Sequence, residues 1–245
     1  SEMCIRDRII PDPYFVIYKH VVNLLGGKCV FVDSYPDFDL PVEGIVQAIT
    51  DKTKMIILNS PCNPTGIVYS DEQVRALAKI AAEKDILVLT DEIYEQFCYD
   101  GSCASIAKYH EKVLLMRGFS KSYAMTGWRL GAAIGPRELI EVIDRLSVND
   151  ESCSNHFIQY GAVEGLAGDQ SGPREILRIL EERRDIAVDI LNSIDGVRCF
   201  RPDATFYLFP NVTGAMARKG IESYDEFRTR ALEETGISFC TRLHF

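Results

Sequence analysis

The chain has 245 residues, of which 47% are hydrophobic and 26% charged, and its formal net charge is −9 at pH 7. This composition is that of an ordinary globular protein with enough chain for one large or two modest domains. An acidic chain without a lysine or arginine cluster is not expected to bind nucleic acid, and no apolar run is long enough to cross a membrane.

The first part of the chain alternates apolar, β-branched runs with helix-like stretches. The runs predict strands at residues 28–34, 55–60, 86–93 and 113–119, and the stretches predict helices at 42–50 and 71–84. Ser70, ahead of Asp71 and Glu72, is a good start signal for the second helix. Apolar strands separated by helices predict a mainly parallel sheet with helices on both faces, which is a three-layer α/β domain.

From Pro136 onward the pattern changes to long helices, of which the longest is predicted at residues 172–193. Short strands are predicted around 197–200 and 205–209, a helix near 223–235, and another strand at 237–240. We therefore predict a large α/β domain over residues 1–171. A connecting helix and an incomplete, smaller α+β domain are predicted over 172–245.

Both ends of the chain depart from this pattern. Residues 1–8 carry no periodicity and no cap, so we expect them to be foreign to a fold whose pattern begins at Ile9. The chain stops at Phe245, directly after a predicted strand. We expect a fragment that lacks the N-terminal part of the large domain and the end of the small one.

The eight cysteines are scattered, without a Cys-x-x-Cys pair, and the chain has four histidines. This spacing gives no zinc signature, and we predict no metal site. Because the start of the chain has no secretory signal, we interpret the cysteines as reduced, mostly structural thiols and predict a cytoplasmic location.

The segment NSPCNPTG, residues 59–66, follows a predicted strand and precedes a predicted helix. In an open α/β sheet, ligands bind outside the carboxyl ends of the strands. Two prolines and a glycine would fix this loop, and Asn63 would offer its side-chain amide to a ligand oxygen. An ordinary strand-to-helix turn explains the same residues without a ligand.

The next predicted strand ends in the segment DEIY, at the same edge of the sheet. Asp91 at a buried strand end costs desolvation free energy unless it has a partner, and a protonated ring nitrogen would be one. Tyr94, three residues on, would reach the same ligand with its hydroxyl. The alternative is that Asp91 caps the following turn and that Tyr94 is ordinary packing at the rim.

The segment GFSKSYAMTGWRLGAAIG, residues 118–135, places Lys121 eight residues ahead of Arg129. The residues next to the lysine, Ser120 and Ser122, predict a turn at the mouth of the sheet. In such a turn the lysine would hold an aldehyde cofactor as a Schiff base. Arg129, ahead of an apolar and strand-like run, would bind a phosphate.

The three segments together bring a set of polar side chains to three successive strand ends of one predicted sheet. They supply a hydroxyl partner, a ring-nitrogen partner, an imine nucleophile and a phosphate ligand, which is the set that pyridoxal 5'-phosphate needs. The motifs NSPCNPTG, DEIY and SKSYAMTGWRLG resemble those of the fold-type I aminotransferases of class I and II, over nearly the whole chain from about Ile9 to Phe245.

The resemblance implies a role for each residue of this set. Lys121 forms the internal aldimine and, once freed by the substrate amine, moves the Cα proton. Asp91 pairs with the pyridine nitrogen and strengthens the electron sink. Asn63 and Tyr94 bind the phenolic oxygen of the ring, and Arg129 binds the phosphate.

Further members of the site follow from the same resemblance. Ser120 belongs to the cofactor-binding set. In the segment PDPYF, Phe15 aligns best with the aromatic residue that stacks on the cofactor ring, with Tyr14 second, although Phe15 as a simple core residue is the alternative. In the segment PDATFY, Phe206 is a possible side wall of the substrate pocket.

The sequence also departs from the family pattern. Gly118 stands where a phosphate-binding serine is usual, and Ala204 stands where glycine is usual. The glycine-rich phosphate turn and the partner-subunit tyrosine are expected upstream of Ile9, and the arginine that clamps the substrate carboxylate beyond Phe245. Arg242 aligns with a turn position and is not assigned that role.

Other residues are weaker candidates. His156 could approach the site from a neighbouring subunit, but a structural role at a helix start is the simpler interpretation. Tyr18 and His20 follow the stacking segment and could line the pocket, but we assign them no role. Residues 181–184, EERR, are predicted to be a solvated helix face with intrahelical ion pairs.

The leading hypothesis is a cytoplasmic aminotransferase that moves an amino group between an amino acid and a 2-oxo acid, acting as a homodimer by resemblance. One alternative is a C–S or C–C lyase on the same fold, which uses the same lysine, aspartate and arginine. Another is a non-catalytic aminotransferase-like domain of a regulator. Without the carboxylate clamp and part of the phosphate site, we expect these 245 residues alone to be weakly active or inactive.

Overall fold

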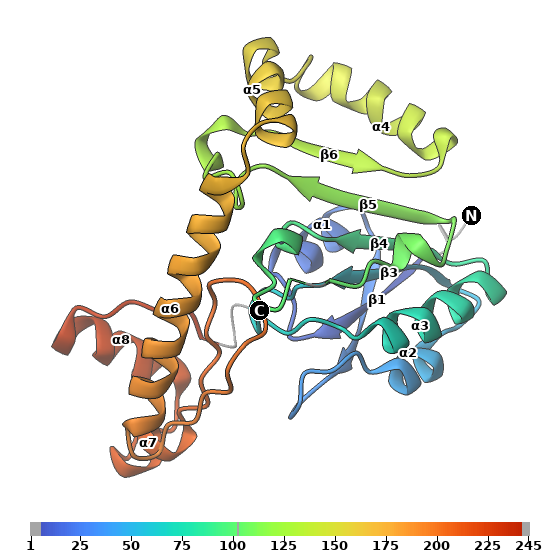
Figure 1. Ribbon diagram of the computed structural model, residues 1–245. Helices are drawn as coiled ribbons and strands as arrows, with labels where there is room; N and C mark the ends of the chain where they lie inside the picture. The colour runs from blue at the N-terminus through green and yellow to red at the C-terminus, as the bar shows by residue number, and fades with distance from the viewer. Residues whose placement is uncertain (1–5, 102, 242–245) are drawn as a thin grey trace.

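The structure is a computed structural model that describes residues 6–101 and 103–241. Its centre is a six-stranded sheet in the order β2-β1-β3-β4-β5-β6 (Figure 1). Strands β1 to β5 are parallel, and β6 runs antiparallel to β5. The strands are β1 (Asp7–Asp12), β2 (Lys28–Asp33), β3 (Thr53–Asn59), β4 (Leu87–Asp91), β5 (Val113–Gly118) and β6 (Gly131–Ile134).

Helices cover both faces of this sheet, with α1 on one face and α2 and α3 on the other (Figure 1). The helices of this region are α1 (Ile17–Leu24), α2 (Val42–Ala48) and α3 (Asp71–Glu83). Ser70 caps α3 by accepting from the Gln73 N–H, while the Gln73 side chain accepts from the Ser70 N–H. The predicted three-layer, mainly parallel α/β architecture is confirmed.

Successive side chains of the central strands enter two different cores. Ile56 and Leu58 of β3 are buried with Leu77 of α3, whereas Ile57 packs with Val22 of α1 on the opposite face. A strand that is buried on both faces needs apolar residues at every position rather than at alternate ones. This requirement explains why continuous apolar runs mark the strands in the sequence.

The second half of the chain is mostly helical, as the sequence predicts. α4 and α5 lie beside β6, and the long α6 runs from there to α7 and α8 (Figure 1). The bounds are α4 (Arg137–Asp150), α5 (His156–Ala167), α6 (Ser171–Ser193), α7 (Thr213–Arg218) and α8 (Tyr224–Thr235). Three short 3-10 helices complete the elements, at η1 (Glu95–Phe97), η2 (Ile106–Lys108) and η3 (Thr126–Trp128).

The strands predicted after α6 are wrong. In place of strands at 197–200 and 205–209 there are two isolated bridges, between Arg198 and Asn211 and between Cys98 and Ala204. Thr205 has φ of +68°, which interrupts an extended strand, and Pro202 has no N–H to donate to a ladder. Residues 237–240 form no strand either.

The start of the fold also differs from the prediction. Strand β1 begins at Asp7, two residues before Ile9, and lies between β2 and β3 near the centre of the sheet. The sequence pattern predicts neither the strand Asp7–Asp12 nor the helix Ile17–Leu24. The apolar run of β1 is short and contains Pro11, so its period is too weak to mark a strand.

The prediction that all cysteines are reduced is wrong for one pair. The loop after η1 folds back so that the Cα atoms of Cys98 and Cys103 are 6.5 Å apart, and the two sulfur atoms form a disulfide. Five other cysteines of the described residues are free thiols, at positions 29, 62, 153, 199 and 240. No group of three His, Cys, Asp or Glu residues in the described part of the chain could hold a metal ion.

None of the helices in residues 6–101 and 103–241 combines the length and the apolar character needed to span a membrane.

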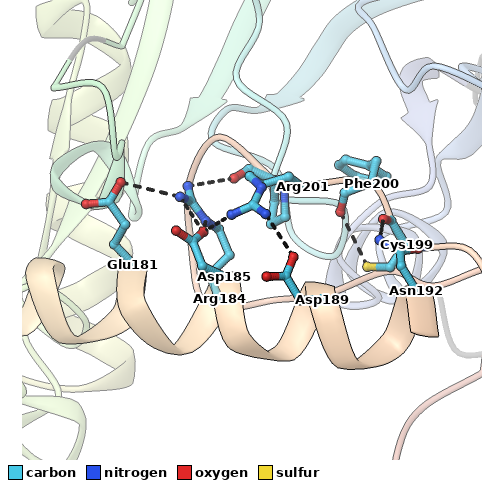
Figure 2. A network of polar contacts seen from close by, with 9 residues as sticks. Glu181, Arg184, Asp185, Asp189, Asn192, Cys199, Phe200 and Arg201 are labelled. Carbon is cyan, nitrogen blue, oxygen red and sulfur yellow. Dashed lines mark hydrogen bonds and ion pairs between the residues drawn. The ribbon is translucent and has the colours of Figure 1, made fainter. Parts of the chain in front are cut away.

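The expectation that residues 181–184 are a solvated face is wrong for Arg184. Its side chain is only 10% exposed, and its guanidinium lies 4.1 Å from the centroid of the Tyr99 ring. It donates to the Pro202 carbonyl at 3.2 Å (Figure 2). Tyr99 donates in turn to the Thr205 carbonyl. Arg184 therefore fastens the segment at Pro202–Thr205 to α6.

A second set of contacts holds the neighbouring residues of this segment on α6 (Figure 2). The Asn192 side chain donates to the Cys199 carbonyl at 2.8 Å and accepts from the Cys199 N–H at 2.9 Å. Arg201 forms ion pairs with Asp185 and Asp189. The segment from Cys199 onward is thus positioned by one helix before it reaches Phe206.

Replacing Arg184 by alanine is expected to lower the free energy of unfolding by about 2–3 kcal/mol, because a charged hydrogen bond and a cation–π contact are lost at a buried site. The matched control is Arg178→Ala on the same helix, where the side chain is 55% exposed and forms ion pairs with Glu175 and Glu182. Such exposed pairs contribute about 0.5 kcal/mol or less. Urea unfolding of both variants measures the difference, and equal losses would contradict the anchoring role.

Candidate active site

The Asn59 side chain holds the loop after β3 in place through two hydrogen bonds. Its Oδ1 accepts from the Asn63 N–H at 2.7 Å, and its Nδ2 donates to the Asp91 carbonyl at 2.9 Å. One amide therefore fixes the loop and joins the ends of two neighbouring strands. Asn59 is not among the residues predicted for the site, although a polar residue at the end of an apolar strand is a signal for it.

Gly66 closes this loop against the C-terminal part of the chain. Its φ of +77° is in the left-handed region, and a Cβ atom here would lie 2.5 Å from the Cβ of Pro202. Its carbonyl accepts from the Ala204 N–H at 3.0 Å. Ala204, at the position where glycine is expected, is fully buried. The loop of residues 59–66 and the segment before Phe206 thus pack directly against each other, with no space for a side chain at position 66.

Asn63 and Tyr94, the two residues expected to bind a phenolic oxygen, meet at Tyr207, which is not among the predicted site residues. The hydroxyl oxygens of Tyr94 and Tyr207 are 2.8 Å apart, and the Asn63 Nδ2 donates to the Tyr207 hydroxyl at 3.2 Å. Burial raises the pKa of Tyr94, and its bond with Tyr207 raises it further. Both tyrosines are therefore neutral near pH 7 and able to donate.

The Asn63 side chain is almost fully buried, and its Oδ1 has no hydrogen-bond partner among the described residues. A buried polar atom without a partner costs free energy, so such atoms are expected at sites that bind polar ligands. Tyr207 directly follows Phe206 in the segment PDATFY, which was the signal that could have identified it.

Asp91 ends β4 with its carboxylate held by two donors. Its Oδ1 accepts from the Ile93 N–H at 3.2 Å, and its Oδ2 accepts from the Tyr18 hydroxyl at 2.8 Å. Burial raises the pKa of Asp91, and these two hydrogen bonds act in the opposite direction. Tyr18 comes from α1, 73 residues earlier in the chain.

Glu92, the neighbour of Asp91, serves a different purpose. Its carboxylate is buried and accepts from the Ser105 hydroxyl at 2.6 Å and from Arg117 at 3.1 Å. Arg117 also pairs with Glu95 at 2.5 Å. Asp91 accepts from Tyr18 of α1, whereas Glu92 accepts from Ser105 and Arg117, so the two neighbouring carboxylates have different partners. Glu92 thus belongs to a structural network behind the strand end.

Lys121 lies in the turn after β5, as predicted. Its Nζ is 5.8 Å from the centroid of the Tyr94 ring and 5.6 Å from that of the Phe206 ring. Ser120 is half-buried in the same turn. The structure thus brings Lys121, Tyr94 and Phe206 together from three separate segments.

Arg129 is exposed and has φ of +55°, so the backbone turns sharply between η3 and β6. Its guanidinium donates to the Thr126 carbonyl at 3.1 Å. Gly118, three residues before Lys121, packs against Ile93, whose Cδ1 would lie 2.4 Å from a Cβ atom. The Ile93 side chain thus takes the space that a serine would need at position 118.

The two candidate stacking residues have different environments. Tyr14 is buried, stacks on Phe31 at 4.6 Å and belongs to the core under α1, so the structure commits it to packing. Phe15 is half-buried and contacts the edge of the Tyr18 ring at 5.7 Å. Of the two, Phe15 is therefore the ring that is not enclosed in the core.

The remaining candidates lie apart from these contacts. His156 is exposed at the start of α5 and makes an edge contact with Tyr160 at 5.2 Å. His20 is exposed on α1. Arg242 lies outside the described residues.

The chain is similar to known proteins. A family model for aminotransferases of class I and II matches residues 5–241. The aspartate aminotransferase of Bacillus subtilis (strain 168) is 38% identical over 237 residues, or 94% of this chain and 60% of that protein. The asparagine–oxo-acid transaminase of Streptococcus mutans is 36% identical over 244 residues, or 97% of this chain and 62% of that protein.

Solved structures agree with these matches. The crystal structure of the aspartate aminotransferase from Rhizobium meliloti has a TM-score of 0.93 at 33% identity, and the match covers 100% of this chain and 64% of that one. An aromatic aminotransferase from Pyrococcus horikoshii has a TM-score of 0.87 at 35% identity, covering 94% and 62%. The chain spans about 60% of the length of the curated relatives it matches.

Proposed function

The chain belongs to the class I and II aminotransferases, and from this premise we propose that it binds pyridoxal 5'-phosphate and moves an amino group between an amino acid and a 2-oxo acid. The family, which the three motifs indicate, is confirmed, and its members depend on pyridoxal 5'-phosphate. The activity of this chain is our inference, supported by the side chains at the carboxyl edge of β3, β4 and β5.

The observation that carries the proposal is the environment of the Asp91 carboxylate. It is half-buried and accepts hydrogen bonds from the Tyr18 hydroxyl and the Ile93 N–H, and no lysine or arginine of the described residues forms an ion pair with it. Lys121 follows the neighbouring strand β5 and lies near aromatic faces instead. A cofactor with a protonated ring nitrogen and an aldehyde needs an anion and a lysine at neighbouring strand ends. The residues present therefore fit pyridoxal 5'-phosphate.

When bound, this cofactor supplies an electron sink for the electron pair left at the substrate Cα. The Lys121 Nζ would hold the aldehyde carbon covalently and later carry the proton taken from the substrate Cα. The Asp91 carboxylate would keep the ring nitrogen protonated by accepting its N–H. The Tyr94 hydroxyl and the Asn63 amide would donate to the phenolic oxygen.

Other side chains would orient and enclose the cofactor. Phe15 would cover one face of the ring. Ser120 and Arg129 would bind the phosphate. Phe206 would border the substrate beside Lys121 and exclude water from it, supported by the distance of 5.6 Å between the Lys121 Nζ and the Phe206 ring.

The relatives differ in the amino acid that their names contain. They include an aspartate aminotransferase, an asparagine–oxo-acid transaminase, and the aromatic-amino-acid aminotransferase 2 of Thermococcus litoralis at 39% identity over 212 residues. The substrate panel should therefore contain aspartate, asparagine, phenylalanine and tyrosine, each with a 2-oxo acid acceptor.

The test is an absorbance scan of the purified chain after incubation with pyridoxal 5'-phosphate and removal of the free cofactor by gel filtration. We expect a visible band that co-elutes with the protein and moves to the near ultraviolet when a substrate amino acid is added. A band that persists while pyruvate or ammonia accumulates would identify the lyase instead. A protein without any retained band would contradict the proposal.

Several expectations from the sequence stay predictions. They are the homodimer, the cytoplasmic location, the domain boundary at residue 171 and the low activity of these 245 residues alone. A chain that retains the cofactor but turns over substrate slowly would agree with the last of these. Normal transamination rates would contradict it.

A further inference from the structure

Tyr18 joins two parts of the site that the chain brings from far apart. It lies in the first turn of α1, three residues after Phe15. Its hydroxyl donates to the Asp91 Oδ2 at 2.8 Å, and its ring meets the Phe15 ring edge-on at 5.7 Å with an interplanar angle of 85°. One side chain therefore contacts both the ring-nitrogen partner and the ring-stacking residue of the proposed site.

The Tyr18 hydroxyl is a permanent donor in this place. Its pKa is raised well above the ordinary tyrosine value, first by burial and then by the charge of Asp91. Among the described residues, the other titratable groups that act on this pair are Cys62, in the loop of residues 59–66, and Tyr94 after β4. Burial raises the pKa of both as well, so neither brings a charge near neutral pH.

The Asp91 carboxylate depends on few donors to remain ionised. Burial favours its protonated form, and the Tyr18 hydroxyl and the Ile93 N–H are the groups that oppose burial. The Ile93 N–H belongs to the backbone of the same turn and cannot be removed by a side-chain change. The Tyr18 hydroxyl is therefore the donor to the carboxylate that a side-chain substitution can remove.

We propose that Tyr18 is a positioning residue of this site, which holds the Asp91 carboxylate ionised and fixed in direction while it orients the Phe15 ring. The inference rests on the proposed function and deepens it. Tyr18 acts through Asp91 and Phe15 and is not itself a group that reacts.

The direction of the pH effect follows from the hydrogen bond. A donor to the charged form lowers the pKa of a carboxyl group, so its removal raises that pKa. In Tyr18→Phe, Asp91 is therefore expected to take up its proton at a higher pH than in the wild type. The bound cofactor would lose its anionic partner over the same interval as the pH falls.

The experiment compares Tyr18→Phe with Tyr160→Phe, which makes the same chemical change at an exposed ring on α5. The first readout is the titration of the Asp91 carboxyl carbon by NMR in the cofactor-free protein. The second is the pH dependence of the visible band in the loaded protein. We expect both midpoints to move upward in Tyr18→Phe alone, with cofactor affinity roughly tenfold weaker or more.

A shape-neutral substitution keeps the inference testable if Tyr18→Phe folds poorly. With 3-fluorotyrosine at position 18, the hydroxyl is a stronger donor of nearly the same size, so the Asp91 midpoint should move downward. An Asp91 midpoint that does not respond to either change overturns the inference. A wild-type protein without a visible band contradicts the proposed function, while the cofactor-free titration still decides the role of Tyr18.

Discussion

Replacing Lys121 by alanine is expected to abolish covalent attachment of pyridoxal 5'-phosphate to the chain and to lower amino-group transfer by about 10²–10⁴-fold. The Lys121 Nζ is the amine of this turn that faces Tyr94 and Phe206. Alanine removes both the nucleophile and the group that carries the Cα proton. Borohydride reduction followed by peptide mass mapping locates the attached cofactor, and single-turnover absorbance measures the transfer.

The matched control is Lys79→Ala, which removes an exposed lysine from α3. We expect the control to keep the covalently attached cofactor after borohydride reduction and to have the wild-type spectrum. Cofactor binding without covalent attachment is still expected in Lys121→Ala, because Asp91, Asn63 and Tyr94 remain. If the yield of attached cofactor after borohydride reduction were unchanged in Lys121→Ala, another amine would be the attachment point and the assignment would be overturned.

Replacing Gly66 by alanine is expected to lower the free energy of unfolding by about 2–5 kcal/mol, since two costs combine at this position. The backbone has φ of +77°, which is unfavourable for alanine. The new Cβ would lie 2.5 Å from the Pro202 Cβ and 2.8 Å from the Ala204 carbonyl oxygen, so backbone must move. The same movement would displace Tyr207 from Asn63 and weaken cofactor binding.

The control Gly220→Ala separates the two costs. Gly220 also has a positive φ, of +63°, but nothing lies within 4 Å of its added Cβ. We expect it to lose about 1–2 kcal/mol, from the backbone alone. Urea unfolding of both variants gives the comparison. A loss in Gly66→Ala no larger than that in Gly220→Ala would contradict close packing between the loop of residues 59–66 and the C-terminal segment.

The sequence predicted the site best where its contacts follow from strand direction. Asn63, Asp91 and Lys121 each come shortly after an apolar run, and parallel strands end at a common edge. Each position could therefore be inferred from local pattern alone. The NSPCNPTG, DEIY and SKSYAMTGWRLG motifs then supplied the chemistry that indicated the family.

The sequence did not predict contacts between residues far apart in the chain, nor the path of short irregular segments. Tyr207 lies 144 residues from Asn63, and no period of the sequence relates the two. The residues around Thr205 have the composition of a strand, but a positive φ and the contact with Gly66 impose an irregular path. Arg184 has the helical spacing of a solvated residue and is nevertheless covered by Tyr99.

By itself the sequence determined the three-layer α/β class, the strand ends that carry Asp91, Tyr94 and Lys121, and the family to which the chain belongs. These features depend on local periodicity and on residue types within a few positions of each other. Only the tertiary structure decided that β1 enters the sheet between β2 and β3, which places Tyr18 against Asp91. Strand order and side-chain partners of this kind are set by how surfaces pack in three dimensions, and a linear pattern does not contain that information.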